Sequence, residues 1–220
     1  MAEMLSGRVA SLNDLAAVEG SDYIAAMGVH REVLMNTVLG KYYALARKGK
    51  VFIHSTVIAG VAFPINSSST TPVFGVWNKG DSKTLVVPLL YGCAYVSGTN
   101  VQTGVGLGIT KNTGSSLSTA APISAITEVA PQNALIDSGL AAKCLGFSTG
   151  TLTAASTWLM SLGLNTFTGA ATVPVGIGGP MWFDFNGCLL IPPGNLIQTM
   201  GNAASVGLYQ QTLIVAELQY

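Results

Sequence analysis

The chain has 220 residues, of which 49% are hydrophobic and only 9% charged, and its ten acidic side chains balance its ten basic ones. This length can bury a full core as one all-β domain, and the balanced charge lacks the basic field that nucleic-acid binding needs. Apolar runs such as Leu85–Tyr91 are shorter than the ~20 residues of a membrane-spanning helix. The first residues lack the basic start and apolar stretch of a signal peptide. We therefore expect no nucleic acid and no membrane as partners, and no secretion.

The charges are unevenly spread along the chain. Eleven of the charged residues lie in positions 1–50, nine lie in the remaining positions, and the 40 residues from Cys144 to Phe183 carry none. Ordinary globular domains carry about 25% charged residues because such side chains make a water-facing surface. We therefore expect much of the surface of residues 51–220 to face protein rather than water.

Residues 1–50 are predicted to form an N-terminal arm with short helices. Leu12–Val18 can form one short helix, and the apolar spacing across Val29–Arg47 is helical. Gly40 weakens the second helix, which predicts one bent helix or two short ones, and Gly49 is well placed to end it. This helical or extended arm is expected to reach away from the body and to order on a neighbouring molecule.

From Val51 onward the pattern is that of β-strands, because runs rich in Val, Ile, Leu, Thr and aromatics alternate with Gly, Ser, Asn and Pro. This spacing predicts a β-sandwich or a closed barrel over residues 51–220 rather than βαβ units, and we expect a single β-sandwich. Tight turns are expected at Asn78–Asp81 and at Asn186-Gly187. The predicted strands cover residues 51–58, 72–78, 83–97, 101–110, 123–129, 140–148, 151–161, 181–185, 187–192, 195–201 and 206–219.

Residue types that carry chemistry are few. The three cysteines, Cys93, Cys144 and Cys188, are odd in number and widely spaced, which argues against a disulfide framework and predicts buried small hydrophobes. The two histidines, His30 and His54, fall in different segments and show no metal-ligand spacing. We therefore expect no metal, no cofactor and no catalytic residues, and a protein that is not an enzyme.

Two further features have a structural and a functional interpretation. Asp184, between two phenylalanines, is expected to be partly buried and to act as a hydrogen-bonded turn residue rather than as a catalyst. The run Gly104–Gly108 lacks the spacing of a dinucleotide-binding loop. Its alternation of glycine with valine and leucine instead predicts a strand with one bare face, which another backbone approaches closely.

Aromatic side chains could form a ligand-binding face. Trp77, Trp158 and Trp182, with Phe183 and Phe185, are the residues that could line a sugar-binding surface. Packing in the core or between subunits is the alternative for the same residues, and we expect it to be the commoner role.

Four short motifs between residues 40 and 220 belong together. They are Gly40-Lys41-Tyr42-Tyr43 leading to Val51-Phe52; Thr71–Asn78 followed by Gly80, Ser82, Lys83 and Leu85–Val87; Tyr95–Thr99; and Gly187, Ile191–Gly194, Ala203-Ala204 and Glu217. Together they resemble small jelly-roll virion structural proteins of tailed bacteriophages. Asp81 departs from this pattern, because a small residue is expected there.

The resemblance implies a jelly-roll β-sandwich and the role of a capsid decoration (cement) protein or a minor capsid component. The protein would form a homo-oligomer, with a trimer favoured, bind other virion proteins, and belong to a virion assembled in the host cytoplasm. A receptor- or carbohydrate-binding jelly roll of a phage tail or fibre is the alternative, and a hydrolase is a third class. The residues expected to attach the protein to the capsid are Arg8, Arg31, Lys41, Tyr42, Tyr43, Arg47 and Lys48.

Overall fold

The structure, a computed structural model, describes residues 41–63, 70–98, 103–110, 122–165, 181–202 and 207–219. The chain divides into two units, Met1–Ala44 and Leu45–Tyr220, whereas the sequence placed the boundary after residue 50. The predicted helix Leu12–Val18 lies outside the described residues, as does the part of the predicted helix Val29–Arg47 that precedes Lys41.

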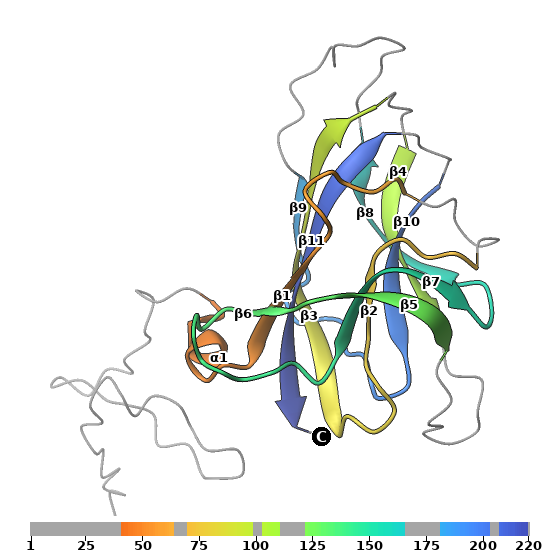
Figure 1. Ribbon diagram of the computed structural model, residues 1–220. Helices are drawn as coiled ribbons and strands as arrows, with labels where there is room; N and C mark the ends of the chain where they lie inside the picture. Colours follow the sequence, from red (N-terminus) through yellow and green to blue (C-terminus); the bar gives the residue numbers. More distant parts are fainter. Residues whose placement is uncertain are drawn as a thin grey trace, which may run out of the picture. The chain divides into compact units, whose positions relative to one another are not determined.

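The unit Leu45–Tyr220 is a sandwich of two antiparallel sheets (Figure 1). One sheet has the strand order β6-β1-β11-β3-β9, and the other has the order β5-β7-β2-β10-β4-β8. The predicted all-β class is confirmed. The elements of the described residues are α1 (Tyr43–Arg47), β1 (Val51–Ser55), β2 (Gly75–Trp77), β3 (Thr84–Ser97), β4 (Thr103–Thr110), β5 (Ile123–Val129), β6 (Gln132–Asn133), β7 (Leu145–Leu152), β8 (Thr157–Asn165), β9 (Met181–Asp184), β10 (Leu196–Gly201) and β11 (Leu208–Gln219).

The order of the strands is that of a jelly roll. Early strands pair antiparallel with late ones in nested fashion: β1 with β11, β2 with β10, β3 with β9, and β4 with β8. Such nesting arises when one long antiparallel double strand folds over on itself, so that its two halves form the two sheets. The eight nested strands thus form the sheets β1-β11-β3-β9 and β2-β10-β4-β8, which confirms the predicted jelly-roll sandwich.

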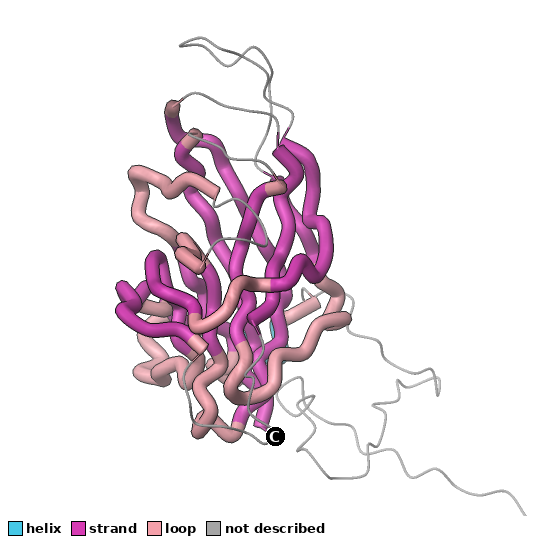
Figure 2. The backbone as a smooth tube through the Cα atoms, turned by 90° about the vertical axis from the view of Figure 1, so that its right-hand side faces the viewer, coloured by secondary structure: helices cyan, strands magenta, loops and turns pink. Residues whose placement is uncertain are grey.

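The strands β5, β6 and β7 lie between β4 and β8 in the chain and extend the jelly roll on one side. β7 pairs with β2 and β5 with β7, while β6 pairs with β1. The segment therefore crosses from one sheet to the other and continues both sheets past β1 and β2 (Figure 1). Figure 2 shows that strands joined by loops make up most of the described part of the sandwich. On the opposite side, β8 and β9 are the outermost strands, and no further strand of the described residues pairs with them.

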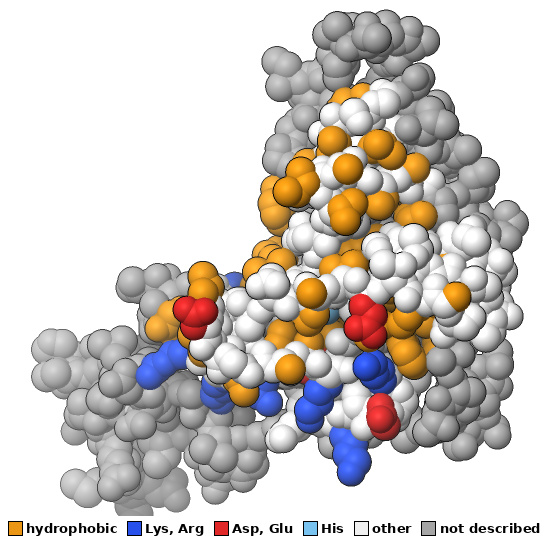
Figure 3. Space-filling model, viewed as in Figure 1, with side chains coloured by type: hydrophobic (Ala, Val, Ile, Leu, Met, Phe, Trp, Pro, Cys, Tyr) orange, Lys and Arg blue, Asp and Glu red, His pale blue; other side chains and the backbone are white. Residues whose placement is uncertain are grey.

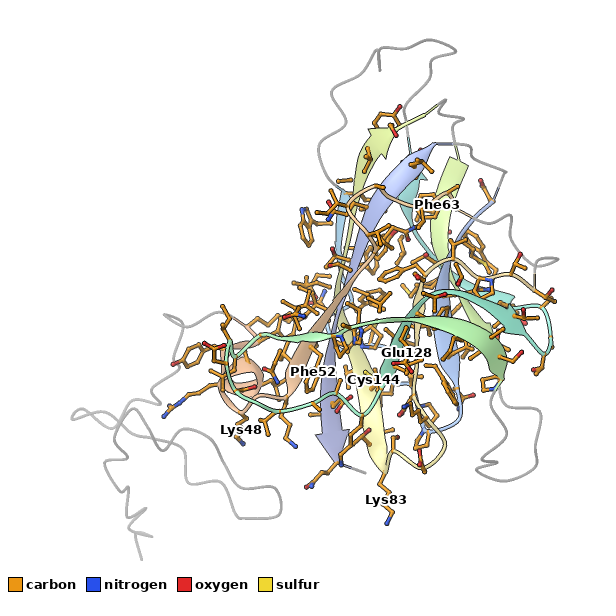
Figure 4. The ribbon with its side chains drawn as sticks, viewed as in Figure 1. Lys48, Phe52, Phe63, Lys83, Glu128 and Cys144 are labelled. Carbon is orange, nitrogen blue, oxygen red and sulfur yellow. The ribbon has the colours of Figure 1, made fainter. Side chains whose placement is uncertain are left out.

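A layer of apolar side chains between the sheets forms the main core. Phe52, Phe63 and Cys144 lie in this layer, whereas Lys83 points away from it (Figure 4). Strand alternation explains the pattern, because successive side chains of a strand point to opposite faces. The largest fully buried members of this core are Phe74, Tyr91, Leu107, Phe185, Ile191, Ile197, Tyr209 and Leu213.

A second, smaller core lies on the outer face of the six-stranded sheet. Leu196 packs there with Ile123, Phe147 and Leu152, whereas its neighbour Ile197 belongs to the main core. Because consecutive residues of a strand face opposite ways, the two clusters lie on opposite faces of the same sheet. The strands β5 and β7, which supply three of these four residues, therefore give the six-stranded sheet packing on both of its faces.

The glycine run forms part of strand β4, as predicted. The space beside its glycines is filled mostly by side chains rather than by backbone. A Cβ on Gly106 would lie 2.3 Å from the Trp158 ring and 2.6 Å from the Met160 carbonyl oxygen. A Cβ on Gly108 would lie 2.3 Å from the Met200 methyl group. As predicted, one backbone atom, the Met160 carbonyl oxygen, approaches Gly106 closely. Most of the space beside Gly106 and Gly108 is filled by the side chains of Trp158 and Met200.

Three strand predictions need correction. Residues 187–192 are not a strand, because Asn186 and Gly187, with φ of 52° and 71°, form a tight turn, after which Ile191 makes an isolated bridge to Val86. The gap between the predicted strands 140–148 and 151–161 lies later in the structure, at residues 153–156. The reason is that β7 continues to Leu152 through its pairing with β5. The two-residue strand β6 was not predicted at all.

The predicted end of the last arm helix is confirmed. Helix α1 is five residues long, and Gly49 follows it with a φ of 65°. The Gly49 N–H donates to the Ala46 carbonyl at 2.9 Å and the Lys50 N–H to the Leu45 carbonyl at 3.0 Å. A glycine in the left-handed region ends helices in this way at no steric cost. No helix within the described ranges has the length and apolar character to cross a membrane.

Candidate functional site

Two of the seven predicted attachment residues, Arg8 and Arg31, lie outside the described residues. Lys41 and Tyr42 are described, and the Lys41 ammonium lies 5.0 Å from the centroid of the Tyr42 ring. A cation over an aromatic face at this distance is attracted by the ring quadrupole. The two neighbours thus form a local cation–π pair.

The other three attachment residues belong to α1 and its end. Tyr43 and Arg47 are one helical turn apart, which places them on one side of the helix. The Tyr43 side chain is 43% exposed, and Arg47 and Lys48 are exposed as well. The structure therefore brings Tyr43, Arg47 and Lys48 together as an exposed basic and aromatic segment.

The structure does not bring the three predicted tryptophans together. Trp77 and Trp158 lie on the outer face of the six-stranded sheet, and strands β10 and β4 separate them. Trp77 is half-buried beside the small core, and its Nε1–H has no hydrogen-bond partner among the described residues. Trp182 lies on the five-stranded sheet, where it is 60% exposed and packs over Gly92. Each tryptophan thus has its own surroundings.

Asp184 is a hydrogen-bonded turn residue, as predicted, but it is exposed rather than partly buried. Its Oδ1 accepts a hydrogen bond from the Asn186 N–H at 2.8 Å. An Asp side chain that binds the backbone two residues later stabilises a turn. Here it fixes the turn that follows β9.

Two of the three cysteines are buried, as predicted, and the third is not. All three are free thiols, Cys93 and Cys144 being buried and Cys188 exposed. Burial raises the pKa of Cys93 from 9.0 to about 12, although its hydrogen bond with Tyr91 lowers this pKa by a smaller amount. The prediction fails for Cys188 because the turn at Asn186-Gly187 carries the following residues to the surface.

Alkylation of the folded protein by iodoacetamide should therefore modify one thiol, that of Cys188. Because the thiolate is the reactive species, the raised pKa of Cys93 slows its reaction about 1000-fold even before burial blocks access. Mass spectrometry of native and unfolded protein, with Cys188→Ser as the control, measures this difference. Rapid native labelling of Cys188→Ser would show that the buried thiols are accessible.

The structure contains a buried cluster that the sequence did not predict. Cys144 Sγ lies 3.6 Å from His54 Nε2, and Glu217 Oε1 accepts hydrogen bonds from the Cys144 and Lys143 backbone N–H groups at 2.6 and 2.7 Å. His54, Cys144 and Glu217 are all buried. They come from β1, from the residue before β7, and from β11, so the cluster joins the two sheets.

The surroundings keep the histidine and the thiol of this cluster neutral. Burial lowers the pKa of His54 from 6.5 to about 4. Burial, and then the nearby charge of Glu217, raise the pKa of Cys144 well above its usual value. A reactive thiolate–imidazolium pair needs shifts in the opposite directions. The cluster of His54, Cys144 and Glu217 is therefore a packed, hydrogen-bonded contact between the two sheets, and its thiol is not activated as a nucleophile.

A glycine makes room for the imidazole. A Cβ on Gly146 would lie 2.3 Å from His54 Nδ1, so the ring packs against bare backbone of β7. His54 Nδ1 has no hydrogen-bond partner among the described residues. Within the same residues, no group of three or more His, Cys, Asp or Glu side chains could hold a metal ion.

Charge is segregated within the sandwich. The described charged residues of the strands and turns lie from the middle of the sheets to one end, where β11 finishes. At the other end, where β3 and β10 finish and β11 begins, the described residues include no charged side chain. These residues are 56–63, 91–98, 103–110, 157–165, 181–183, 199–202 and 207–213. Figure 3 shows this polarity on one face: Lys, Arg, Asp and Glu gather toward the end at which β11 finishes, and hydrophobic and neutral side chains cover the other end.

The chain matches no protein-family model, no curated protein and no solved structure. Its class therefore rests on its own topology, which is that of an all-β jelly-roll sandwich. The site residues define a neutral surface at one end of the sandwich and a basic, aromatic segment at α1.

Proposed function

We propose that this protein is a structural component of a tailed-phage virion, either a capsid decoration (cement) protein or a minor capsid component. It acts through contact area in a homo-oligomer and not through chemistry. The observation that carries the proposal is a jelly roll in which the described residues at one end of the sandwich carry no charged side chain. The resemblance of its motifs to phage jelly-roll proteins points to the virion as the setting.

The physical basis is the composition of protein interfaces. Permanent interfaces resemble a domain core cut in half and are depleted in charged residues. A solvated surface without charge is poorly soluble, because net and mixed charges keep proteins apart. Repeated packing of copies in a shell would cover this surface and would protect the sheet edges, which otherwise invite aggregation.

The charged N-terminal segment supplies attachment in this proposal. Residues 1–50 hold more than half of the charged side chains, and the described part of this segment exposes Tyr43, Arg47 and Lys48. Basic and aromatic side chains are frequent anchors at protein interfaces. We propose that this arm binds the capsid or neighbouring copies while the β body forms the oligomer.

Deletion of residues 1–30 should abolish attachment to shells while the β body stays folded and oligomeric. The expected occupancy, measured as copies per particle on a calibrated gel of shells purified after mixing, falls to background. The paired change Arg47→Ala with Lys48→Ala should lower occupancy in part. Its matched control is Lys83→Ala, which removes an exposed cation of the β2–β3 turn and should leave occupancy unchanged.

Full occupancy of the deletion variant would refute the attachment role of the arm. Absence of this chain from purified virions, in a gel or in the density of the particle, would refute the virion role altogether. The same copy number separates a shell or decoration protein, which is present in hundreds of copies in a particle, from a minor component.

A receptor- or carbohydrate-binding jelly roll is the second candidate, and the exposed Trp182 favours it. An aromatic face on a sheet can stack on a sugar ring, provided that polar groups nearby fix the orientation. Binding on a glycan array that is lost in Trp182→Ala and kept in Trp158→Ala would support this function. An absence of glycan binding by the full chain would exclude this second function.

A further inference from the structure

The two sheets of the sandwich differ in how much of their outer faces is packed. The outer face of the six-stranded sheet is covered by the small core of Leu196 and Phe147 and by the rings and methyl groups that fill the glycine positions of β4. On the five-stranded sheet, the outward-facing side chains around Trp182, such as Ile53, Ile214 and Leu90, are half-buried or exposed. Nearer the end at which β11 finishes, the outward-facing Val51, Val87 and Ala216 are buried.

The register of the strands identifies the residues of this face. The row His54, Leu213 and Tyr91 is fully buried in the sandwich. Because neighbours along a strand alternate between faces, the adjacent row points outward. The apolar residues of the outer sheet face are Ile53, Ile214, Leu90, Ala94, Val96 and Trp182, which lie on four neighbouring strands. The polar residues Ser55, Thr212, Gln210 and Asp184 lie on the same face.

The chemistry of the outer sheet face is unusual for a surface in water. An antiparallel sheet with one solvated face normally carries polar residues there, whereas here six apolar side chains lie beside four polar ones. The Ser55 and Thr212 hydroxyls, which share a cross-strand position on the same face, bond each other at 2.9 Å. Their polar groups are thus partly satisfied without water.

Trp182 forms the most prominent part of this face. The side chain is 60% exposed, yet its ring is held in place, because Gly92 opposite it lacks a Cβ, which would lie 2.7 Å from the ring. A tryptophan that lies flat on bare backbone loses little conformational freedom on binding. Tryptophan is one of the residue types enriched among the anchor residues of protein interfaces.

The charge pattern indicates what covers this face. Among the described residues that point outward on these four strands, Asp184 alone is charged, and its carboxylate already binds the Asn186 backbone. Around a rotation axis, the residues nearest the axis approach their own copies. Any charge there would face a like charge, so a neutral surface suits contact with an identical chain.

The size of the face fits the centre of such a contact. Two strands of about seven residues and two of about four, spaced about 4.8 Å apart, cover on the order of 350 Å². A standard interface buries roughly 800 Å² on each partner, with an apolar centre and a polar rim. The outer sheet face can supply the centre, and the flanking turns can supply the rim.

We propose that the outer sheet face, centred on Trp182, is the surface through which this chain associates with a second copy of itself. The proposal rests on the proposed function for the expectation that the protein is oligomeric. It adds which face makes the contact and which residue anchors it.

Sedimentation velocity of the full chain over a series of concentrations tests the proposal. Trp182→Lys should raise the dissociation constant of self-association at least about 30-fold, as expected for loss of an anchor residue. Val96→Glu, on the same face at a residue that is 40% exposed, should act in the same direction. The matched control is Ile136→Lys, because Ile136 is 83% exposed on the turn after β6, and it should leave the association unchanged.

The outcomes separate the two proposals. An oligomer that survives Trp182→Lys and Val96→Glu but dissociates in Ile136→Lys would overturn the assigned face and leave the oligomeric function standing. A wild-type chain that is monomeric throughout would overturn the oligomeric function. A monomer that binds uncharged phosphatidylcholine vesicles, and loses this binding in Trp182→Lys, would replace the second copy with a lipid surface. Circular dichroism of each variant confirms that it is folded.

Discussion

Replacement of Asn78 by alanine should lower the free energy of unfolding by about 3 kcal/mol. The fully buried Asn78 amide donates to the Thr84 carbonyl at 2.7 Å and to the Ile191 carbonyl at 2.8 Å, and its Oδ1 accepts from the Ser82 hydroxyl. Alanine leaves these buried groups with fewer partners, although the Ile191 carbonyl keeps the Val86 N–H. The segments around Thr84 and Ile191 would thus lose the side chain that joins them.

Denaturant unfolding of the wild type and the variant measures this loss, and the melting temperature should fall by roughly 10 °C. Ser82→Ala is the matched control, because it removes one donor from the same network and should cost about 1 kcal/mol. Asn78→Asp keeps the shape and the acceptor but turns a second oxygen toward two carbonyls, so at pH 7 it should destabilise at least as much as alanine. A loss below about 1 kcal/mol in Asn78→Ala would show that the amide does not hold the two turns together.

Acidification should destabilise the protein through His54 by about 3 kcal/mol between pH 6.5 and pH 4. Burial lowers the pKa of His54 from 6.5 to about 4, so the unfolded chain binds a proton in this window that the folded chain does not. The stability that comes from the neutral, buried imidazole is therefore fully present above pH 6.5 and is lost as the pH falls toward 4. Below pH 4 both states are protonated and this contribution changes no further.

Chemical denaturation of the wild type and of His54→Gln across this pH range isolates the effect. The carboxylates and His30 are common to both chains, so the difference between the two stability curves reports His54. The wild-type curve should fall more steeply than that of the variant below pH 6.5, and the two slopes should agree above it. Parallel curves from pH 7 to pH 4 would mean that His54 can take up its proton without unfolding.

The strand pattern of the body could be predicted from local sequence. Runs such as 83–97 and 206–219 coincide closely with β3 and β11 because long apolar strands that alternate or lie fully buried leave a clear local signal. The turn at Asn186-Gly187 was also predictable, since asparagine and glycine tolerate the positive φ that both adopt there. The two-residue β6 was not, because so short a strand exists only through its pairing with β1.

The buried polar groups could not be located in the same way. His54 and Cys144 are 90 positions apart, and Asn78 binds a carbonyl 113 positions away. The sequence identified Asn78 as a turn residue but gave no sign that its side chain would be buried. Polar contacts between distant segments depend on which strands become neighbours, and local propensity carries no such information.

The sequence by itself determined the all-β class, most strand positions, the end of the last arm helix and the shortage of charge, because each follows from residue type and local spacing. The tertiary structure alone decided which apolar residues share the outer face around Trp182 and where the described charged residues gather. The nested pairing of early with late strands brings neutral segments from separate parts of the chain to one end of the sandwich. This is the physical reason that a shortage of charge, visible in the composition, becomes a defined surface only in the fold.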